Sequence, residues 1–294
     1  MPVKVSICIP AYLSPDFLQR TLHSIALQSY KDYEVIVTDD SLDDTVQKVV
    51  ESFGESLSIK YHHNTVPQGS PQNWNACIDL AHGEYIKIMH HDDWFSNQES
   101  LADFVAMLDD NPAADIAFSA ALSCDEGQNI NSTHRPTPDQ LSCLRQSPSY
   151  LFPANIIGAP SSTIYRRRSH IPFDAKLKWV VDIDFYIQIL LRNDEFAFCE
   201  KPLVCVTSGA QHQVTRQCED NKDVEIYEWI YLYKKLRAAG IIGFKQLNFI
   251  RVLLRKYRVN SLKELKAYNV ESPLPWEIGL VWFLQKCVTA NYRL

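Results

Sequence analysis

The sequence predicts an α/β fold in which a mostly parallel central sheet lies between helices, followed by a helical C-terminal extension. Three observations support this prediction. Strand and helix patterns alternate through the first half of the chain, and the segment YEVIVTDD at residues 33–40 has a continuous apolar run, VIV, as in a parallel strand covered on both faces. After about residue 218 only helical patterns remain, so we expect a main domain over residues 1–218 and an extension over 219–294.

The alternation in the first half follows a regular order. Strands are predicted at 4–12, 33–40, 57–64, 84–93 and 114–123, and helices between them at 14–30, 43–53, 70–83 and 97–112. Ser14 is the expected N-cap of the first helix, with Pro15 at its first position, and Gly83 is expected to end the third helix. A sheet built in this order binds its ligand at the carboxyl ends of its strands.

Composition excludes some classes of protein. Of the 294 residues, 46% are hydrophobic, and the net charge of -6 provides no basic field that would favour nucleic acid as a partner. The eight cysteines lack zinc-ligand spacing and are expected to be buried thiols in a reducing compartment. No apolar run approaches the roughly 20 residues that span a bilayer. The first residues do not resemble a signal peptide. We therefore expect a cytoplasmic protein, at most peripheral at the inner face of the plasma membrane.

Two pairs of adjacent carboxylates follow predicted strands. Asp39 and Asp40 end the second strand, while Asp92 and Asp93 end the fourth, so both pairs are expected at one edge of the sheet. A single pair could simply cap a helix, but adjacent carboxylates that are desolvated need a cation or hydrogen bonds. Neither GxGxxG nor GxxxxGK[ST] is present to cradle phosphates. A divalent cation, Mg2+ or Mn2+, held by Asp93 would supply the missing charge.

Two longer segments resemble a known family. VSICIPAYLSPDFLQRTLHSIALQSYKDYEVIVTDDSLDDT and NWNACIDLAHGEYIKIMHHDDWF are similar to the ordered blocks of family 2 glycosyltransferases of the GT-A fold. The resemblance covers about residues 3–215 and implies a nucleoside-diphosphate sugar donor (a UDP-, GDP- or dTDP-sugar), a divalent cation and inversion at the anomeric carbon. It implies nucleotide-sugar binding by Pro10, Tyr12, Asp39, Asp40, Asp92 and His212, and metal binding by Asp93 and His212.

Within these assignments the resemblance gives Asp40 the stronger role at the base and Asp39 a mainly structural one. Asp92 is expected to contact the ribose or order the loop. His90 and His91 are expected to support the site rather than bind the metal, because a phosphate-bound Mg2+ prefers oxygen ligands.

The catalytic base is expected in the segment KWVVDIDFYIQILLRN. This segment resembles the family pattern E-D-x-D-L-W-L-R-L, whose second acid takes the proton of the acceptor hydroxyl, and that position is Asp182 here. Val181 replaces the usual glutamate of the pattern, and Gln188 replaces the usual arginine. Asp184 is expected only to stabilise the helix, because a negative charge near the N-terminus interacts favourably with the helix dipole.

Three other segments are expected to play supporting roles. Residues 158–162 are candidates to line the sugar pocket. The basic turn at 166–168 could meet an anionic acceptor, although we favour a solvated surface. The basic and aromatic stretch at 244–258 could contact an anionic membrane, although we favour packing on its own domain.

The favoured hypothesis is an inverting glycosyltransferase that transfers a sugar to a saccharide or lipid-linked saccharide in surface polysaccharide synthesis. One alternative is a degenerate nucleotide-sugar-binding or scaffold protein, which the departures at Val181 and Gln188 leave open. A sugar nucleotidyltransferase is less favoured, because its glycine-rich first loop is absent. A metallohydrolase is least favoured, because no second histidine cluster has ligand spacing.

Overall fold

The computed structural model describes residues 3–210, 214–241, 243–268 and 273–291, with the side chains of 217 and 285–291 excepted. The strands are β1 (Val5–Ala11), β2 (Tyr33–Asp39), β3 (Ile59–His63), β4 (Tyr85–Ile88), β5 (Trp94–Phe95), β6 (Ile116–Cys124), β7 (Ile130–His134), β8 (Thr163–Arg166) and β9 (Phe196–Thr207). The helices are α1 (Pro15–Ala26), α2 (Thr45–Ser52), α3 (Gln72–Asp79), α4 (Ser100–Asp109), α5 (Pro138–Gln146), α6 (Val181–Arg192), α7 (Val214–Cys218), α8 (Lys222–Ala238), α9 (Phe244–Lys256), α10 (Leu262–Ala267) and α11 (Trp276–Asn291).

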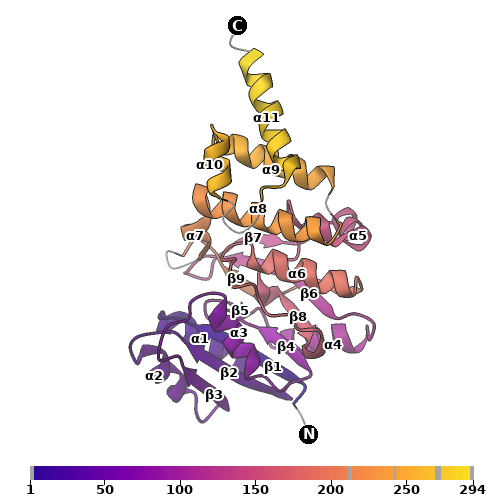
Figure 1. The fold of residues 1–294 in the computed structure, drawn as a ribbon. Helices are drawn as coiled ribbons and strands as arrows, with labels where there is room; N and C mark the ends of the chain where they lie inside the picture. Colours follow the sequence, from indigo (N-terminus) through magenta and orange to yellow (C-terminus); the bar gives the residue numbers. More distant parts are fainter. Residues whose placement is uncertain (1–2, 211–213, 242, 269–272, 292–294) are drawn as a thin grey trace.

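The strands form one mixed sheet whose order, among the described residues, is β3-β2-β1-β4-β8-β6-β9-β5, with β7 added beside β6. The four strands at the β3 end are all parallel, and β8 runs antiparallel between β4 and β6. β6 and β9 pair in parallel and therefore share the direction of β1. The prediction of a mostly parallel sheet between helices is confirmed (Figure 1).

Helices cover both faces of this sheet, and the alternation of side chains along β1 shows how. Ile7 and Ile9 pack into a cluster with residues of α1, α2 and α4, whereas Cys8 joins the opposite cluster with residues of α3 and α6. Both faces are apolar because successive side chains of a strand point to opposite sides. This double burial explains why the strands read as continuous apolar runs rather than as alternating ones.

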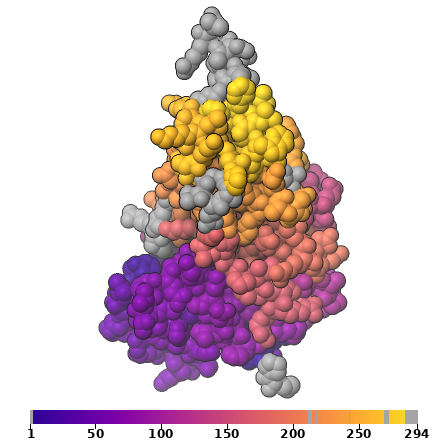
Figure 2. All heavy atoms as spheres, viewed as in Figure 1, coloured from indigo at the N-terminus to yellow at the C-terminus, as the bar shows by residue number. Residues whose placement is uncertain are grey.

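The C-terminal helices stack at one end of the molecule, and the N-terminal half lies at the other (Figure 2). Their side chains complete the cluster around α3 and α6, which extends from Cys8 to Ile278. The division into parts at residue 218 stays a prediction. Among the described helices, none combines the length and the apolar character needed to cross a membrane. The seven cysteines with described side chains are free thiols, and Cys287 lies outside that set.

Some local predictions need correction. The fourth strand ends at Ile88, and the acidic residues after it form a turn. Ser14 is the N-cap of α1 with Pro15 following, but its side chain makes no capping hydrogen bond. Gly83 lies four residues beyond α3, which ends at Asp79, and does not cap it. A Cβ at Gly83 would come within 2.5 Å of the backbone nitrogen of Ser6, so its role is close packing against β1.

Arg166 is likewise not part of a solvated basic turn. It ends β8 and is 7% exposed, and its guanidinium donates to the carbonyl oxygens of Leu108 at 2.8 Å and Ala114 at 2.9 Å. Arg167 and Arg168 are exposed, as expected. None of the three lines the pocket described below, so a role in binding an anionic acceptor there finds no support.

Candidate active site

A pocket of about 360 Å3 opens at the carboxyl ends of β1 and β4. It brings together four of the predicted site residues, namely Pro10, Asp92, Asp93 and Asp182. The other lining residues are Ser70, Trp74, His90, His91, Ala159, Pro160, Lys178, Trp179, Val181, Val206, Thr207, Ser208, Gly209, Val214 and Thr215. The pocket therefore joins the turn after β4, the end of β9 and the start of α6, as the strand order requires.

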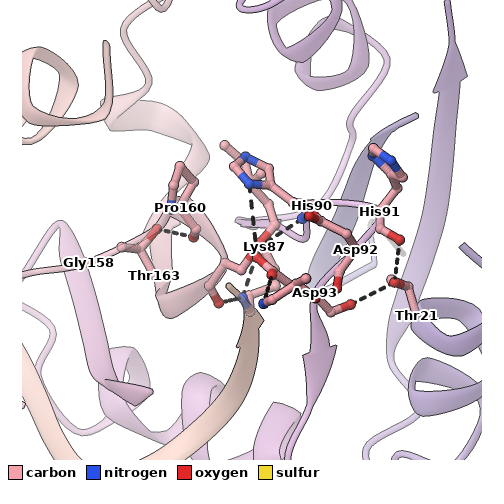
Figure 3. A network of polar contacts seen from close by, with 12 residues as sticks. Thr21, Lys87, His90, His91, Asp92, Asp93, Gly158, Pro160 and Thr163 are labelled. Carbon is pink, nitrogen blue, oxygen red and sulfur yellow. Dashed lines mark hydrogen bonds and ion pairs between the residues drawn. The ribbon is translucent and has the colours of Figure 1, made fainter. Parts of the chain in front are cut away.

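The turn His90–Asp93 is held by its backbone. The hydroxyl of Thr21 on α1 lies 2.8 Å from the carbonyl oxygen of His91 and 2.6 Å from that of Asp93 (Figure 3). The hydroxyl of Thr207 at the end of β9 donates to the carbonyl oxygen of Asp92. Because neighbouring elements take up these carbonyl groups, the turn is fixed independently of what its side chains bind.

Asp93 is the most deeply buried acid of the turn, at 2% exposed. Its Oδ1 accepts a hydrogen bond from the backbone amide of Thr207 at 2.9 Å. Its Oδ2 has no hydrogen bond of ordinary geometry, and Nδ1 of His90 lies 4.0 Å away. Burial, and then the neighbouring Asp92 carboxylate, raise the pKa of Asp93 well above its usual range. A buried carboxylate oxygen without a hydrogen bond suits a bound cation.

The sequence predicted only a supporting role for His90, but its ring lies close enough to the acids of the turn to share a ligand with them. One ring nitrogen and one oxygen each from Asp92 and Asp93 lie within 4.8 Å of one another. Burial lowers the pKa of His90 to about 4, so its imidazole is neutral at pH 7 and can act as a ligand. The ring of Trp74 lies 4.8 Å from the ring of His90, between centroids, and limits its orientation.

Beneath the turn lies a buried cation that sequence reasoning missed. Lys87 is fully buried in β4, and its Nζ donates to the carbonyl oxygens of Ile88, at 3.1 Å, and Ser161. Its ammonium group also lies 4.5 Å from the ring centroid of Phe104. Burial lowers the pKa of Lys87 to about 7, and the attraction of Asp93 opposes that shift. A lysine inside the apolar run YIKI was the signal that could have identified it.

Asp182 lies in the first turn of α6 and lines the same pocket as the acidic turn. Its Oδ2 accepts a hydrogen bond from Nδ2 of Asn155 at 2.8 Å, and its Oδ1 accepts one from the amide of Ile183 at 2.8 Å. The side chain is partly exposed to the pocket, yet protein surrounds the carboxyl group. Desolvation therefore raises the pKa of Asp182 to about 7.

Asp39, Asp40 and Tyr12 do not line this pocket. Asp39 is fully buried and accepts hydrogen bonds from the amide of Ser41 and the hydroxyl of Tyr61, both at 2.8 Å. Asp40, 3% exposed, anchors the loop after β3, because its oxygens accept from Nδ2 of Asn64 and from two loop amides.

Three further predictions have different outcomes. Tyr12 is 53% exposed at the surface beyond β1. His212 lies outside the described residues. Of the segment 158–162, Ala159 and Pro160 line the pocket.

Comparison with known proteins identifies the family of the chain. Residues 6–171 match the model of the family described as glycosyl transferase family 2. Staphylococcus aureus poly(ribitol-phosphate) beta-N-acetylglucosaminyltransferase TarS is 30% identical over 112 residues, which cover 37% of this chain and 19% of TarS. Salmonella typhimurium abequosyltransferase RfbV is 28% identical over 143 residues, which cover 47% of this chain and 43% of RfbV. The matched segments thus span less than half of either relative's own length.

Solved structures confirm the expected GT-A fold. The structure of S. aureus TarS residues 1–349 in complex with UDP-GlcNAc has a TM-score of 0.66 at 21% identity, covering 91% of this chain and 76% of that one. The mannosyltransferase PcManGT from Pyrobaculum calidifontis in complex with GDP-Man and Mn2+ has a TM-score of 0.58 at 16% identity, covering 99% and 76%. Because the family model matches more than half of the chain, the protein belongs to glycosyl transferase family 2.

Proposed function

We propose that the protein is an inverting glycosyltransferase that moves a sugar from a nucleoside-diphosphate sugar to an acceptor hydroxyl with the help of a divalent cation. One observation carries the proposal. Asp93 and Asp182 reach the same pocket from different elements, and each carboxyl group has its pKa raised by burial. Groups with shifted pKa values that converge in a cleft are typical of active sites. The donor complexes of TarS and PcManGT support a nucleotide sugar as the ligand.

The residues of the acidic turn fit a cation. Asp93 offers its unpartnered Oδ2, and Asp92 and His90 provide further ligand atoms within 4.8 Å. Mg2+ and Mn2+ are commonly bound by one or two carboxylates together with phosphate oxygens, and Mn2+ accepts an imidazole more readily than Mg2+ does. When bound, the cation supplies positive charge against the diphosphate that leaves.

Asp182 would take the proton of the acceptor hydroxyl. A general base works best when its pKa is near the working pH, and its pKa of about 7 meets this condition. The hydrogen bonds from Asn155 and from the amide of Ile183 fix the carboxylate while it faces the pocket. With the base on one side of the sugar and the diphosphate on the other, displacement is in line and inverts the anomeric carbon.

We propose Pro10, Tyr12, Asp40 and Asp92 for the nucleoside part of the donor, and His212 for the diphosphate or metal. Asp40 would act partly through the loop that it anchors, because the amides of Gln68 and Gly69 donate to its carboxylate. Asp39 would support this arrangement from the interior.

The acceptor that we propose is a saccharide, free or lipid-linked, of a bacterial surface polysaccharide. The names of TarS and RfbV support this class of acceptor.

The C-terminal helices support contact with a membrane that carries lipid-linked acceptors. Residues 244–268 contain seven basic residues and one acidic residue, and Phe244 and Trp276 are 82% and 67% exposed. We expect the protein to bind anionic vesicles but not neutral ones. The double variant Phe244→Ser with Trp276→Ser should lose this binding.

The function is tested with two variants that separate the two carboxylates. Wild type, Asp93→Asn and Asp182→Asn are melted with UDP, GDP and dTDP, each with Mn2+ or with a chelator. A diphosphate at 100 times its Kd stabilises the native state by about 2.7 kcal/mol, or roughly 4 °C in Tm for a chain of this length. We expect one diphosphate to stabilise wild type and Asp182→Asn only with Mn2+, and Asp93→Asn to lose the response.

Turnover is then followed as release of the nucleoside diphosphate from the matching sugar nucleotides, into water and with extracted lipid-linked acceptors. We expect Asp182→Asn to lose at least 100-fold in kcat while keeping its thermal response. Binding without turnover in wild type would instead support a nucleotide-sugar-binding scaffold. No thermal response with any diphosphate would refute the proposed site.

A further inference from the structure

Helix α8 reaches the segment that leads into α6 with a buried carboxylate. Glu228, 3% exposed, accepts backbone hydrogen bonds from the amides of Lys178 and Trp179, both at 2.9 Å, and of Val180 at 3.0 Å. Three consecutive amides are thus bound by one side chain. A negative charge at this point also favours α6, because its N-terminus carries partial positive charge.

A second residue of α8 reaches the same region with the opposite charge. The Nζ of Lys235 lies 2.6 Å from Oδ2 of Asp184 on α6 and 2.9 Å from Oδ2 of Asp174. The hydroxyl of Tyr231, one turn earlier on α8, donates to the same Asp174 oxygen at 2.9 Å. Glu228 and Lys235 are seven residues apart, so they lie on one face of α8.

These two contacts coincide with the two departures of the chain from the family pattern. Val181 stands where the pattern has a glutamate, and Glu228 brings a carboxylate to this end of α6. Gln188 stands where the pattern has an arginine, and its amide lies only 3.4 Å from Oδ1 of Asp184, while Lys235 supplies the cation. Each charge missing from α6 is therefore present on α8.

We propose that Glu228 and Lys235 are positioning residues that hold the segment 174–184, and with it Asp182, in its catalytic conformation. The inference rests on the proposed function of Asp182. It gives the C-terminal extension a direct part in the reaction, since α8 fixes the base without touching the substrate. It also makes Val181 and Gln188 compatible with an active enzyme.

The hydrogen bonds from the amides of residues 178–180 to Glu228, which we call the clamp, are tested without any substrate. Hydrogen exchange of the segment 174–184 is measured by mass spectrometry in the full-length protein, in wild type, Glu228→Gln and Glu228→Ala. The matched control is Glu225→Gln, because Glu225 is also 3% exposed on α8 but accepts from the amide of Asp220 and from Lys256 instead. We expect exchange of the amides at 178–180 to rise at least tenfold in both Glu228 variants and to stay within twofold in the control.

The positioning role is tested by moving the positive charge from α8 to α6. Lys235→Ala is compared with Lys235→Ala combined with Gln188→Arg, which returns a cation to α6 within reach of Asp184. We expect Lys235→Ala to lower kcat for nucleoside-diphosphate release at least tenfold with little change in the KM of the sugar nucleotide. The added Gln188→Arg should restore kcat to within about threefold of wild type, which a general loss of stability would not allow.

The outcomes distinguish this inference from the proposed function. Unchanged exchange at 178–180 in the Glu228 variants overturns the clamp, whatever the activity. Raised exchange with an unchanged kcat, or a kcat that Gln188→Arg does not restore, overturns the positioning role. If wild type releases no diphosphate from any sugar nucleotide, the proposed function fails, and the positioning role falls with it even where exchange confirms the clamp.

Discussion

Replacing Asp182 by asparagine should stabilise the protein in a pH-dependent way. The pKa of Asp182 rises from 3.8 to about 7 on folding, so the native state binds the proton more tightly than the unfolded chain does. The stability that protonated Asp182 contributes to the wild type is therefore lost as the pH rises from about 4 to 7, and the asparagine variant lacks this contribution to the pH dependence. That difference in pKa corresponds to about 4 kcal/mol. Over pH 5 to 8, with solvent in the pocket screening part of it, we expect about 1–2 kcal/mol.

The assay is urea unfolding of wild type and Asp182→Asn at pH 5 and pH 8. The variant also weakens the hydrogen bond from Asn155, which is a loss of about 1 kcal/mol at both pH values, so only the change with pH is diagnostic. Asp139→Asn serves as the control, because Asp139 is an exposed acid in the first turn of α5. Curves for Asp182→Asn that run parallel to wild type within about 0.5 kcal/mol would refute a desolvated carboxyl group at this position.

Three further substitutions test other parts of the structure. Asp40→Ala should weaken the cation-dependent binding of the diphosphate at least tenfold by calorimetry, because it releases the loop amides that its carboxylate accepts; equal affinity would exclude a role in the site. Gly83→Ala should destabilise by about 1–3 kcal/mol in urea unfolding, because the new Cβ meets the backbone of Ser6 at 2.5 Å. Lys87→Met should destabilise by about 1–3 kcal/mol, because it leaves the buried carbonyl of Ser161 without its donor; an unchanged midpoint would contradict that role.

The sequence was sufficient to predict the strands β1 to β4 and β6, and four of the residues that line the pocket. The apolar runs that end in Asp40 and Asp93 predicted the strands, because burial on both faces leaves a local signature in the chain. The strand order then brought Asp93 to the edge where ligands bind. Asp182 could be placed only through the family resemblance, since nothing local distinguishes an acid that faces a pocket from one that caps a helix.

The contacts that depend on distant packing left no such signature. Glu228 lies about 50 residues beyond the amides that it binds, and Asn155 lies 27 residues before Asp182. Arg166 looked like part of a charged turn, because the carbonyl groups that it binds belong to α4 and to the loop before β6. Periodicity records which face of an element is buried, but it does not record which polar partner the fold brings there.

The two apolar clusters also differ in when they can close during synthesis. The cluster under α1, α2 and α4 needs no residue beyond Val204, whereas the opposite cluster needs residues as late as Ile278. At 5–20 residues per second, the ribosome takes roughly 4–15 s to make the segment between them. During that time the nascent chain carries a sheet with one face only partly covered. A chain that stops shortly after Val204 is therefore expected to aggregate or be degraded rather than to fold as a smaller transferase.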